Sequence, residues 1–200
     1  MAERRSPLAM VVLSLLAEAP MHAYGMQQLI KSRRKDEVVN VAQRNSVYQA
    51  IERLLRDGYI QVRHTAREAG RPERTVYELT DSGRAMQEEW LRSMLSTPAR
   101  EFPEFPAALA FVTTLPAEDA QRRLEMRIAA LEDRLARVRA DAKVGQDMRL
   151  PRIFLIEGEY EAAMVRAELA YVRKLVDDFR DGRLTWTPEW LAAVSAQFEG

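Results

Sequence analysis

The sequence contains no cysteine and only two histidines among its 200 residues. Without cysteine, neither a disulfide framework nor a thiolate metal site is possible. No stretch approaches the roughly 18 consecutive apolar residues of a membrane-spanning helix. We expect no signal peptide after Arg4 and Arg5. These absences favour a cytoplasmic protein with no metal and no cofactor.

The common motifs of enzymatic chemistry are also missing. The sequence has no phosphate-binding glycine loop, no GxSxG motif and no GxGxxG motif. Glu157 and Glu161 share a helix face but have no histidine near them in the sequence, so a solvated face explains them better than a metal site. We therefore expect a protein that is not an enzyme.

Charge is balanced overall but divided along the chain. Residues 1–84 hold 14 lysines and arginines against 10 aspartates and glutamates, and residues 85–200 hold 16 against 20. A modest positive excess has the sign expected of a nucleic-acid-binding half, because phosphate contacts supply most non-specific DNA affinity. An ordinary charged surface explains the same numbers, so the split alone decides little.

The segment 45–84 has the pattern of a helix followed by a hairpin. Val47, Ile51, Leu54 and Leu55 form one apolar helical stripe, and Gly58 suits the end of that helix. Residues 60–62 and 76–79 read as two short strands around a loop rich in arginine. A helix followed by a hairpin with a basic tip is typical of a winged helix-turn-helix, whose helix fits the major groove of DNA.

Further helices complete this module. Apolar spacing predicts a first helix over about 8–18 and a second over 24–34, and the third begins at about residue 43. Residues 80–83 offer capping oxygens for a fourth helix from Gly83 to about Ser96. The fold class expected is therefore mainly α: an N-terminal winged helix-turn-helix of three helices and a β-hairpin wing, then a helical dimerisation domain with coiled-coil-like helices.

Several short motifs resemble the PadR family of transcriptional regulators. They are Pro20-Met21-His22-x-Tyr24, Ser46-x-Tyr48-x-x-Ile51-x-Arg53-Leu54, Gly58-Tyr59-Ile60, Gly70-Arg71-Pro72-Glu73-Arg74-x-x-Tyr77 and Leu79-Thr80-x-x-Gly83-Arg84. The resemblance covers residues 7–95, and the remainder resembles the longer helical domain of the virulence-activator-like branch. Where many members have glycine or proline before the tyrosine, this chain has Ala23. The resemblance implies a DNA-binding regulator that acts as a homodimer.

The DNA-contacting residues follow from the module. Asparagine and glutamine suit adenine, serine and tyrosine hydroxyls suit phosphate oxygens, and arginine suits guanine or the backbone. The wing would reach phosphates or the minor groove. The candidates are Asn45, Ser46, Tyr48, Gln49 and Arg53 on the third helix, with Arg67, Arg71 and Arg74 on the wing. Tyr48 has an alternative role, in which its ring packs on the second helix.

The second half contains a heptad pattern. Leu124, Ile128, Leu131, Leu135, Val138 and Ala142 are spaced four and three residues apart, as in a coiled-coil seam. Gly145 is expected to break this helix, and Pro151 to start the next, which runs to about Asp181. Its apolar positions add Ile156, Tyr160, Met164 and Tyr171 to the expected dimer surface. The alternative is a helical hairpin within one chain.

A proline-rich connector separates the halves. The expected domains are 1–96 for DNA binding, 97–106 as connector and 107–200 for dimerisation. Trp90, Phe102 and Phe105 are expected to pack between the domains. A pocket for a small aromatic effector, which the resemblance allows, is the alternative.

These patterns predict a sequence-specific DNA-binding regulator, a repressor that binds double-stranded palindromic DNA as a homodimer and that a small molecule would release. The alternative is a winged-helix module that binds another protein and no DNA. The basic wing and Arg53 favour DNA.

Overall fold

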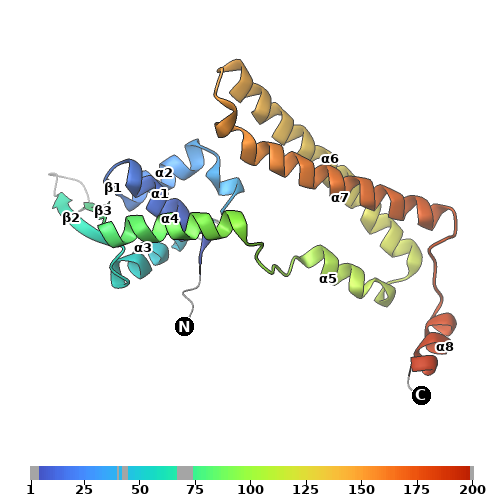
Figure 1. Cartoon of the computed structure of the whole chain (residues 1–200). Coiled ribbons are helices and arrows are strands. Elements are labelled where there is room, and N and C mark those ends of the chain that lie inside the picture. The colour runs from blue at the N-terminus through green and yellow to red at the C-terminus, as the bar shows by residue number, and fades with distance from the viewer. Residues whose placement is uncertain (1–4, 40, 42–44, 67–73, 199–200) are drawn as a thin grey trace. The chain divides into compact units, whose positions relative to one another are not determined.

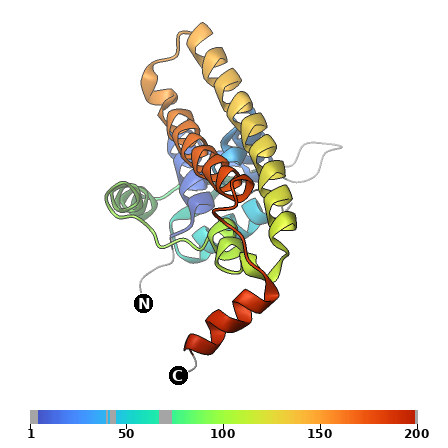
Figure 2. The ribbon, with the colours of Figure 1, turned by 90° about the vertical axis from the view of Figure 1, so that its right-hand side faces the viewer.

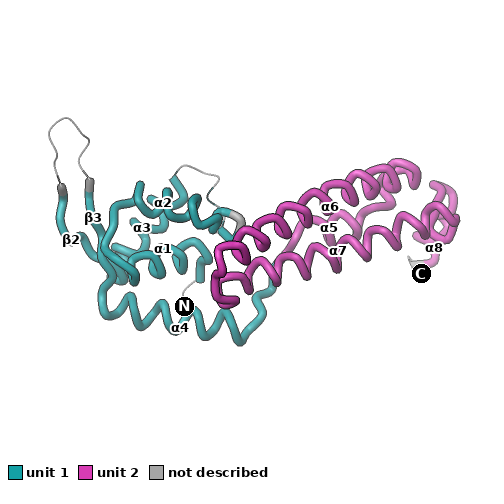
Figure 3. The backbone as a smooth tube through the Cα atoms, turned by 90° about the horizontal axis from the view of Figure 1, so that it is seen from above, with its two compact units in different colours: residues 1–101 teal, residues 102–200 magenta. Residues whose placement is uncertain are grey.

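The computed structural model describes residues 5–39, 41, 45–66 and 74–198. The chain divides into two compact units, residues 1–101 and 102–200 (Figures 1 and 3). Each unit has its own hydrophobic core. The two are therefore described one at a time.

Unit 1 is a winged helix-turn-helix, as predicted. Its elements, in chain order, are α1 (Pro7–Glu18), β1 (Met21–His22), α2 (Ala23–Ser32), the 3-10 turn η1 (Lys35–Glu37), α3 (Ser46–Arg56), β2 (Ile60–Ala66), β3 (Arg74–Leu79) and α4 (Asp81–Ser96).

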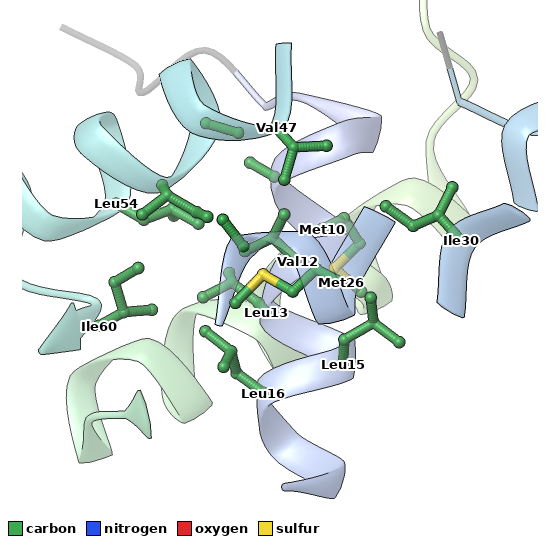
Figure 4. Close-up of a cluster of buried hydrophobic side chains, with 14 of the residues drawn as sticks. Met10, Val12, Leu13, Leu15, Leu16, Met26, Ile30, Val47, Leu54 and Ile60 are labelled. Carbon is green, nitrogen blue, oxygen red and sulfur yellow. The ribbon is translucent and has the colours of Figure 1, made fainter. Parts of the chain in front are cut away.

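Helix α1 lies at the centre of unit 1 because it is apolar on most of its circumference. Val12 and Leu13 are fully buried, and α1 contacts α3, α4 and β3. Met26 of α2 and Leu54 of α3, both also fully buried, pack into the same cluster (Figure 4). Side chains of α1, α2 and α3 therefore share one buried cluster, which holds α3 against α1.

Side-chain caps set three helix starts. Ser6, His22 and Thr80 cap α1, α2 and α4, each accepting a hydrogen bond from a backbone N–H three residues on. The cap at Thr80 confirms the capping oxygens predicted for the fourth helix, although α4 begins at Asp81 and not at Gly83. Helix α3 begins at Ser46, later than predicted.

The sheet of unit 1 has three antiparallel strands in the order β1-β3-β2. Strand β1 pairs Met21 with Tyr77 and His22 with Val76, and so joins the start of α2 to the wing. Strand β1 was not predicted, because two residues are too few for strand alternation to be visible in a sequence.

Unit 2 is helical. Its elements are α5 (Glu104–Ala110), η2 (Val112–Thr114), α6 (Ala117–Asp147), η3 (Arg152–Phe154), α7 (Ile156–Arg180) and α8 (Pro188–Phe198). Helices α6 and α7 lie side by side as an antiparallel hairpin (Figures 1 and 2). In the described part of the chain, no helix combines the length and apolar character needed to span a bilayer.

The heptad of α6 forms the core of this hairpin. Leu131 and Leu135 pack in one buried cluster with Val165, Leu169 and other residues of α7. Ion pairs between the two helices flank the seam, as charged residues do beside coiled-coil seams. They join Arg127 to Glu168, Arg134 to Glu161, Arg173 to Glu132 and Arg180 to Glu125.

Three backbone predictions for this half were wrong. Pro151 does not start α7: it precedes the 3-10 turn η3, and α7 begins at Ile156. Gly145 does not break α6, which continues to Asp147 and is followed by Arg149 at a φ of 54°. Gly145 is buried, and an added Cβ would stand 2.6 Å from a methyl of Leu155, so its role is close packing. The connector also ends earlier than predicted, since Pro106 lies in the first turn of α5, where its missing N–H costs no helical hydrogen bond.

Candidate nucleic-acid interface

Helix α3 presents a polar face to solvent because its apolar face is buried in the core of unit 1. Val47, Ile51 and Leu54 are at most 2% exposed and fix the rotation of the helix. Tyr48 and Gln49, which lie between these positions, are therefore exposed. Its first turn thus combines a phenol and an amide, which suit phosphate and adenine respectively.

The structure brings the five predicted α3 residues together on this helix. Asn45, Tyr48 and Gln49 are exposed, and Ser46 and Arg53 are half-buried. Asn45 is the N-cap residue, but its side chain makes no capping hydrogen bond. Its amide is thus not used to cap the helix. Tyr48 is 46% exposed, and the alternative in which its ring packs on α2 stays untested.

The wing lies next to α3 in the chain and is joined to it by a rigid corner. Gly58 adopts a φ of 75°, which confirms its predicted place just past the helix end. Its carbonyl accepts hydrogen bonds from the Thr80 and Ser82 hydroxyls at the start of α4. Strand β2 therefore leaves α3 at a point held by the following helix.

The strands of the wing are paired through six residues of β3. Ile60 lies opposite Leu79 and Thr65 opposite Thr75, with an irregularity between Val62 and His64. Arg67 and Arg71 lie outside the described residues. Arg74 begins β3, but nothing is described of its side chain. The basic wing tip therefore stays a prediction.

Two exposed cations near α3 were missing from the predicted set. Arg63 on β2 has a side chain 53% exposed and stands 3.8 Å from Glu78, a loose ion pair. Arg56 in the last turn of α3 has a side chain 72% exposed. Arg63 could have been found from its place in the strand. It follows Gln61 by two residues, and alternate residues of a strand face the same side.

Electrostatics link α3 to the sheet. Burial raises the pKa of the Tyr77 phenol above its usual value, a hydrogen bond with Thr75 opposes the shift, and Tyr48 and Glu52 of α3 add to it. Tyr77 is therefore a neutral hydroxyl beside the exposed face of α3. Next to this position, His22 holds α2 in place, with its Nδ1 accepting the Gly25 N–H at 2.7 Å.

Residues 12–89 match the model of the transcriptional regulator PadR-like family. The match spans α3, the wing and most of α4, the elements that form the candidate interface. The similarity of this chain to the PadR-like family of transcriptional regulators therefore lies in its winged helix-turn-helix module. The members of this family are regulators and not enzymes.

Solved structures share this fold over most of the chain. They include smu.1604c from Streptococcus mutans UA159 (TM-score 0.65, 17% identity, 86% of this chain and 99% of that one). They also include PadR from Bacillus subtilis in complex with operator DNA (TM-score 0.61, 17% identity, 85% of this chain and 99% of that one). A third is the Vibrio cholerae virulence activator AphA (TM-score 0.66, 15% identity, 87% of this chain and 98% of that one). At these identities, the likeness shows the fold alone. No curated protein matches the chain.

The three aromatics considered for an effector do not share one cluster in this PadR-like chain. Trp90 is 4% exposed in the core of unit 1, with its ring edge-on to Tyr59 at 6.4 Å. Phe105 packs on the hairpin core, with the Arg127 guanidinium 3.7 Å from its ring centroid. Phe102 is 81% exposed. An effector site at these residues stays untested.

The predicted dimer residues fall into two groups. Those of α6 face α7 of the same chain and are buried or half-buried there: Leu124, Ile128, Leu131, Leu135 and Val138. Those of α7 are 48–68% exposed: Ile156, Tyr160, Met164 and Tyr171. The α6 heptad is thus used inside the hairpin, whereas the α7 stripe has no partner within the hairpin core.

Proposed function

We propose that this PadR-like regulator binds operator DNA sequence-specifically as a homodimer and represses transcription in the cytoplasm. The observation that carries the proposal is the rotation of α3, whose buried Val47, Ile51 and Leu54 turn Tyr48 and Gln49 outward beside the wing. A helix of this kind enters the major groove, and its first turn meets the base edges.

DNA binding is tested by a pair of charge-matched variants. Arg53→Ala removes a cation from α3, and Arg92→Ala removes one from α4, where its side chain is 75% exposed and pairs with Glu88. DNA fragments retained by the purified protein supply the probe for fluorescence anisotropy at several salt concentrations. Arg53→Ala should weaken binding and lower the log–log salt slope by about one unit, and Arg92→Ala should change neither.

Specificity is tested separately at Gln49. Replacing it with alanine should change which sequences are retained, because a bidentate amide contact discriminates adenine by about 1–3 kcal/mol. A wild-type protein that retains no fragment over random DNA would favour the alternative, a winged-helix module that binds another protein.

The dimer part of the proposal rests on the exposed stripe of α7. The outward face from Ile156 to Tyr171 carries no charged residue, and alanines 163, 167 and 170 allow close approach of another helix. An exposed apolar face of this length on a charged helix marks an interaction surface. Two copies related by a twofold axis would bury the same stripe on both chains.

One antiparallel register of the two stripes also brings opposite charges together. With the axis between Val165 and Arg166, Tyr160 faces Tyr171 of the second copy, and Met164 faces its Ala167. The same register brings Glu157 opposite Lys174 of the second copy. Two opposite-charge pairs per dimer then flank an apolar centre.

Sedimentation of Tyr160→Glu tests this surface. The variant should be monomeric where wild type is dimeric, and its operator affinity should fall, because two half-sites need two joined modules. Ala129→Glu, on an exposed position of α6, is the control and should stay dimeric. A dimeric Tyr160→Glu would place the interface elsewhere.

Release from DNA by a small aromatic effector is proposed separately and is tested at Trp90. Because Trp90 is buried, a ligand that stacks on it has to open the core of unit 1. A chain that keeps only Trp90, with Trp186 and Trp190 replaced by phenylalanine, reports on this directly. Quenching by a phenolic acid together with loss of DNA binding would support an effector there, and unchanged fluorescence would remove it from the proposal.

A further inference from the structure

The tip of the hairpin, residues 144–156, exposes several large apolar side chains to solvent. Its large side chains are 40–67% exposed: Val144, Met148, Leu150, Ile153, Phe154 and Ile156. None of the six belongs to the buried cluster of the hairpin or packs against it. A contiguous apolar patch of this kind marks a place where another element docks.

Helix α8 is amphipathic, and its apolar face would be stabilised by packing on an apolar surface. Trp190, Leu191 and Val194 fall on one face, and Trp190 is 55% exposed. The helix has 11 residues, and isolated helices below roughly 12–15 residues are marginal in water. None of the described α8 side chains is among those of the hairpin core, and α8 stands apart from the α6–α7 pair (Figures 1 and 2).

The tip of its own chain is out of reach of α8. The indole N–H of Trp186 donates to the Leu115 carbonyl at 2.9 Å, and its ring packs edge-on against Phe179. These contacts hold residue 186 at the base, where α6 begins and α7 ends. Helix α7, with 25 residues, separates base from tip by about 37 Å, whereas the 11 residues of α8 extend about 16 Å.

In the antiparallel register, the tip of the second copy lies within reach of α8. When the two α7 stripes face each other in opposite directions, the base of one hairpin lies beside the tip of the other. We propose that α8 of each chain packs its Trp190 face on the tip of the second copy, as an exchanged arm. This inference rests on the homodimer proposed above and adds its second contact.

Charge supports this occupant of the tip. Residues 144–156 carry Arg149 and Arg152 against a single acid, Asp147, whereas α8 carries Glu189 and no base. Arg152 is paired with Glu159 of its own chain, so Arg149 is the base of the tip that would meet Glu189. Two such arms would add buried apolar area at both ends of the α7 interface.

Cross-linking tests the arm directly, because the chain has no cysteine of its own. The full-length double variant Trp190→Cys, Phe154→Cys is treated with a short bis-maleimide and run on a denaturing gel, and sedimentation of the untreated sample gives its assembly state. We expect a covalent dimer. An equimolar mixture of the two single variants should give it too, whereas each single variant alone should not.

The control pairs the same arm position with Asp133→Cys, an exposed site midway along α6, and should give no covalent dimer. An internally linked monomer would show α8 on its own tip and overturn the inference. A sedimenting dimer without cross-link would overturn it too, while leaving the proposed homodimer intact. A protein monomeric in sedimentation would overturn both.

A second, independent measurement uses the stability of the dimer. Val194→Asp puts a charge on the packing face of α8 and should raise the dimer dissociation constant about tenfold or more. Ser195→Asp, on the adjacent exposed position, should leave it within about twofold. Equal dissociation constants for the two variants would mean that the Trp190 face of α8 contacts nothing in the dimer.

Discussion

Gly83 shows how one residue holds the wing corner in place. It is buried in the first turn of α4, and a Cβ added there would stand 1.9 Å from the backbone carbonyl oxygen of Tyr59. Because backbone cannot move aside as a flexible side chain can, Gly83→Ala should destabilise unit 1 by about 1–3 kcal/mol or more. Urea unfolding followed by circular dichroism measures the loss.

Gly158 is the matched control for this substitution. It lies in α7, and nothing stands within 4 Å of an added Cβ. Gly158→Ala should therefore stabilise the chain, by up to about 1 kcal/mol, because alanine is the better helix former. If Gly83→Ala also stabilised the chain, helix propensity and not the Tyr59 contact would govern Gly83.

A second residue-scale prediction concerns the pair that ties the end of α1 to the end of α2. The Arg33 guanidinium donates two hydrogen bonds to the Glu18 carboxylate, at 2.6 and 2.7 Å. These hydrogen bonds lower the pKa of Glu18 below its ordinary 4.5, against a smaller effect of burial. A lowered folded-state pKa means that the stabilisation is present above pH 4.5 and is lost as the pH falls through the folded-state value.

Glu18→Gln should therefore reduce the free energy of unfolding at neutral pH by no more than about 1 kcal/mol, since both side chains are partly exposed. The difference from wild type should shrink steadily below about pH 4.5. Denaturant titrations at neutral and acidic pH compare the two proteins. A difference that stayed constant or grew on acidification would contradict the role given to this pair.

The glycines show where sequence reasoning worked and where it ended. Gly58 was predictable because a helix end that needs positive φ is a local requirement. Gly83 and Gly145 instead allow the close approach of residues outside their own helices, the Tyr59 backbone and the Leu155 side chain. Such a requirement has no local signature, and Gly145 was for that reason misread as a helix breaker.

At the scale of elements, α7 carries two apolar stripes, and the sequence could not choose between them. Ile156, Tyr160 and Met164 follow helical spacing as well as Ala162, Val165 and Leu169 do. The second set faces α6 and the first is exposed, as burial shows. Periodicity identifies a face but not its partner, so a seam within the chain and one between chains look the same.

The hairpin core gives the element-scale prediction. Leu135 is 6% exposed between α6 and α7, so Leu135→Ala should cost about 2–5 kcal/mol. Met126 on the same helix is 64% exposed, and Met126→Ala should stay within about 0.5 kcal/mol of wild type. Thermal unfolding by circular dichroism compares them. Equal small losses would indicate that the α6 heptad is not packed within one chain.

At the scale of the whole molecule, the fold class was predictable, because helix and strand periods and turn residues are local. The polar face of α3 was predictable for the same reason, since the burial of Val47 and Ile51 determines where Gln49 points. Subunit association was not, since it depends on the stripe that remains after each chain has packed its own core. In this chain, that stripe is the exposed apolar face of α7.

Charge reversal tests that register with both proteins folded. The register places Glu157 opposite Lys174 of the second copy, so Glu157→Lys and Lys174→Glu each put like charges together twice per dimer. Each single variant should dissociate more readily than wild type, and the double variant should recover, because it restores opposite charges with their positions exchanged. Exposed pairs contribute roughly 0.2–1 kcal/mol each, so a loss of about two- to thirtyfold in the dimer association constant is expected at low salt. Sedimentation at low and high salt measures the dimer association constant, and at high salt, screening should reduce the difference between the single variants and wild type.

Failure of the double variant to recover would exclude this register while leaving the exposed α7 stripe available in another.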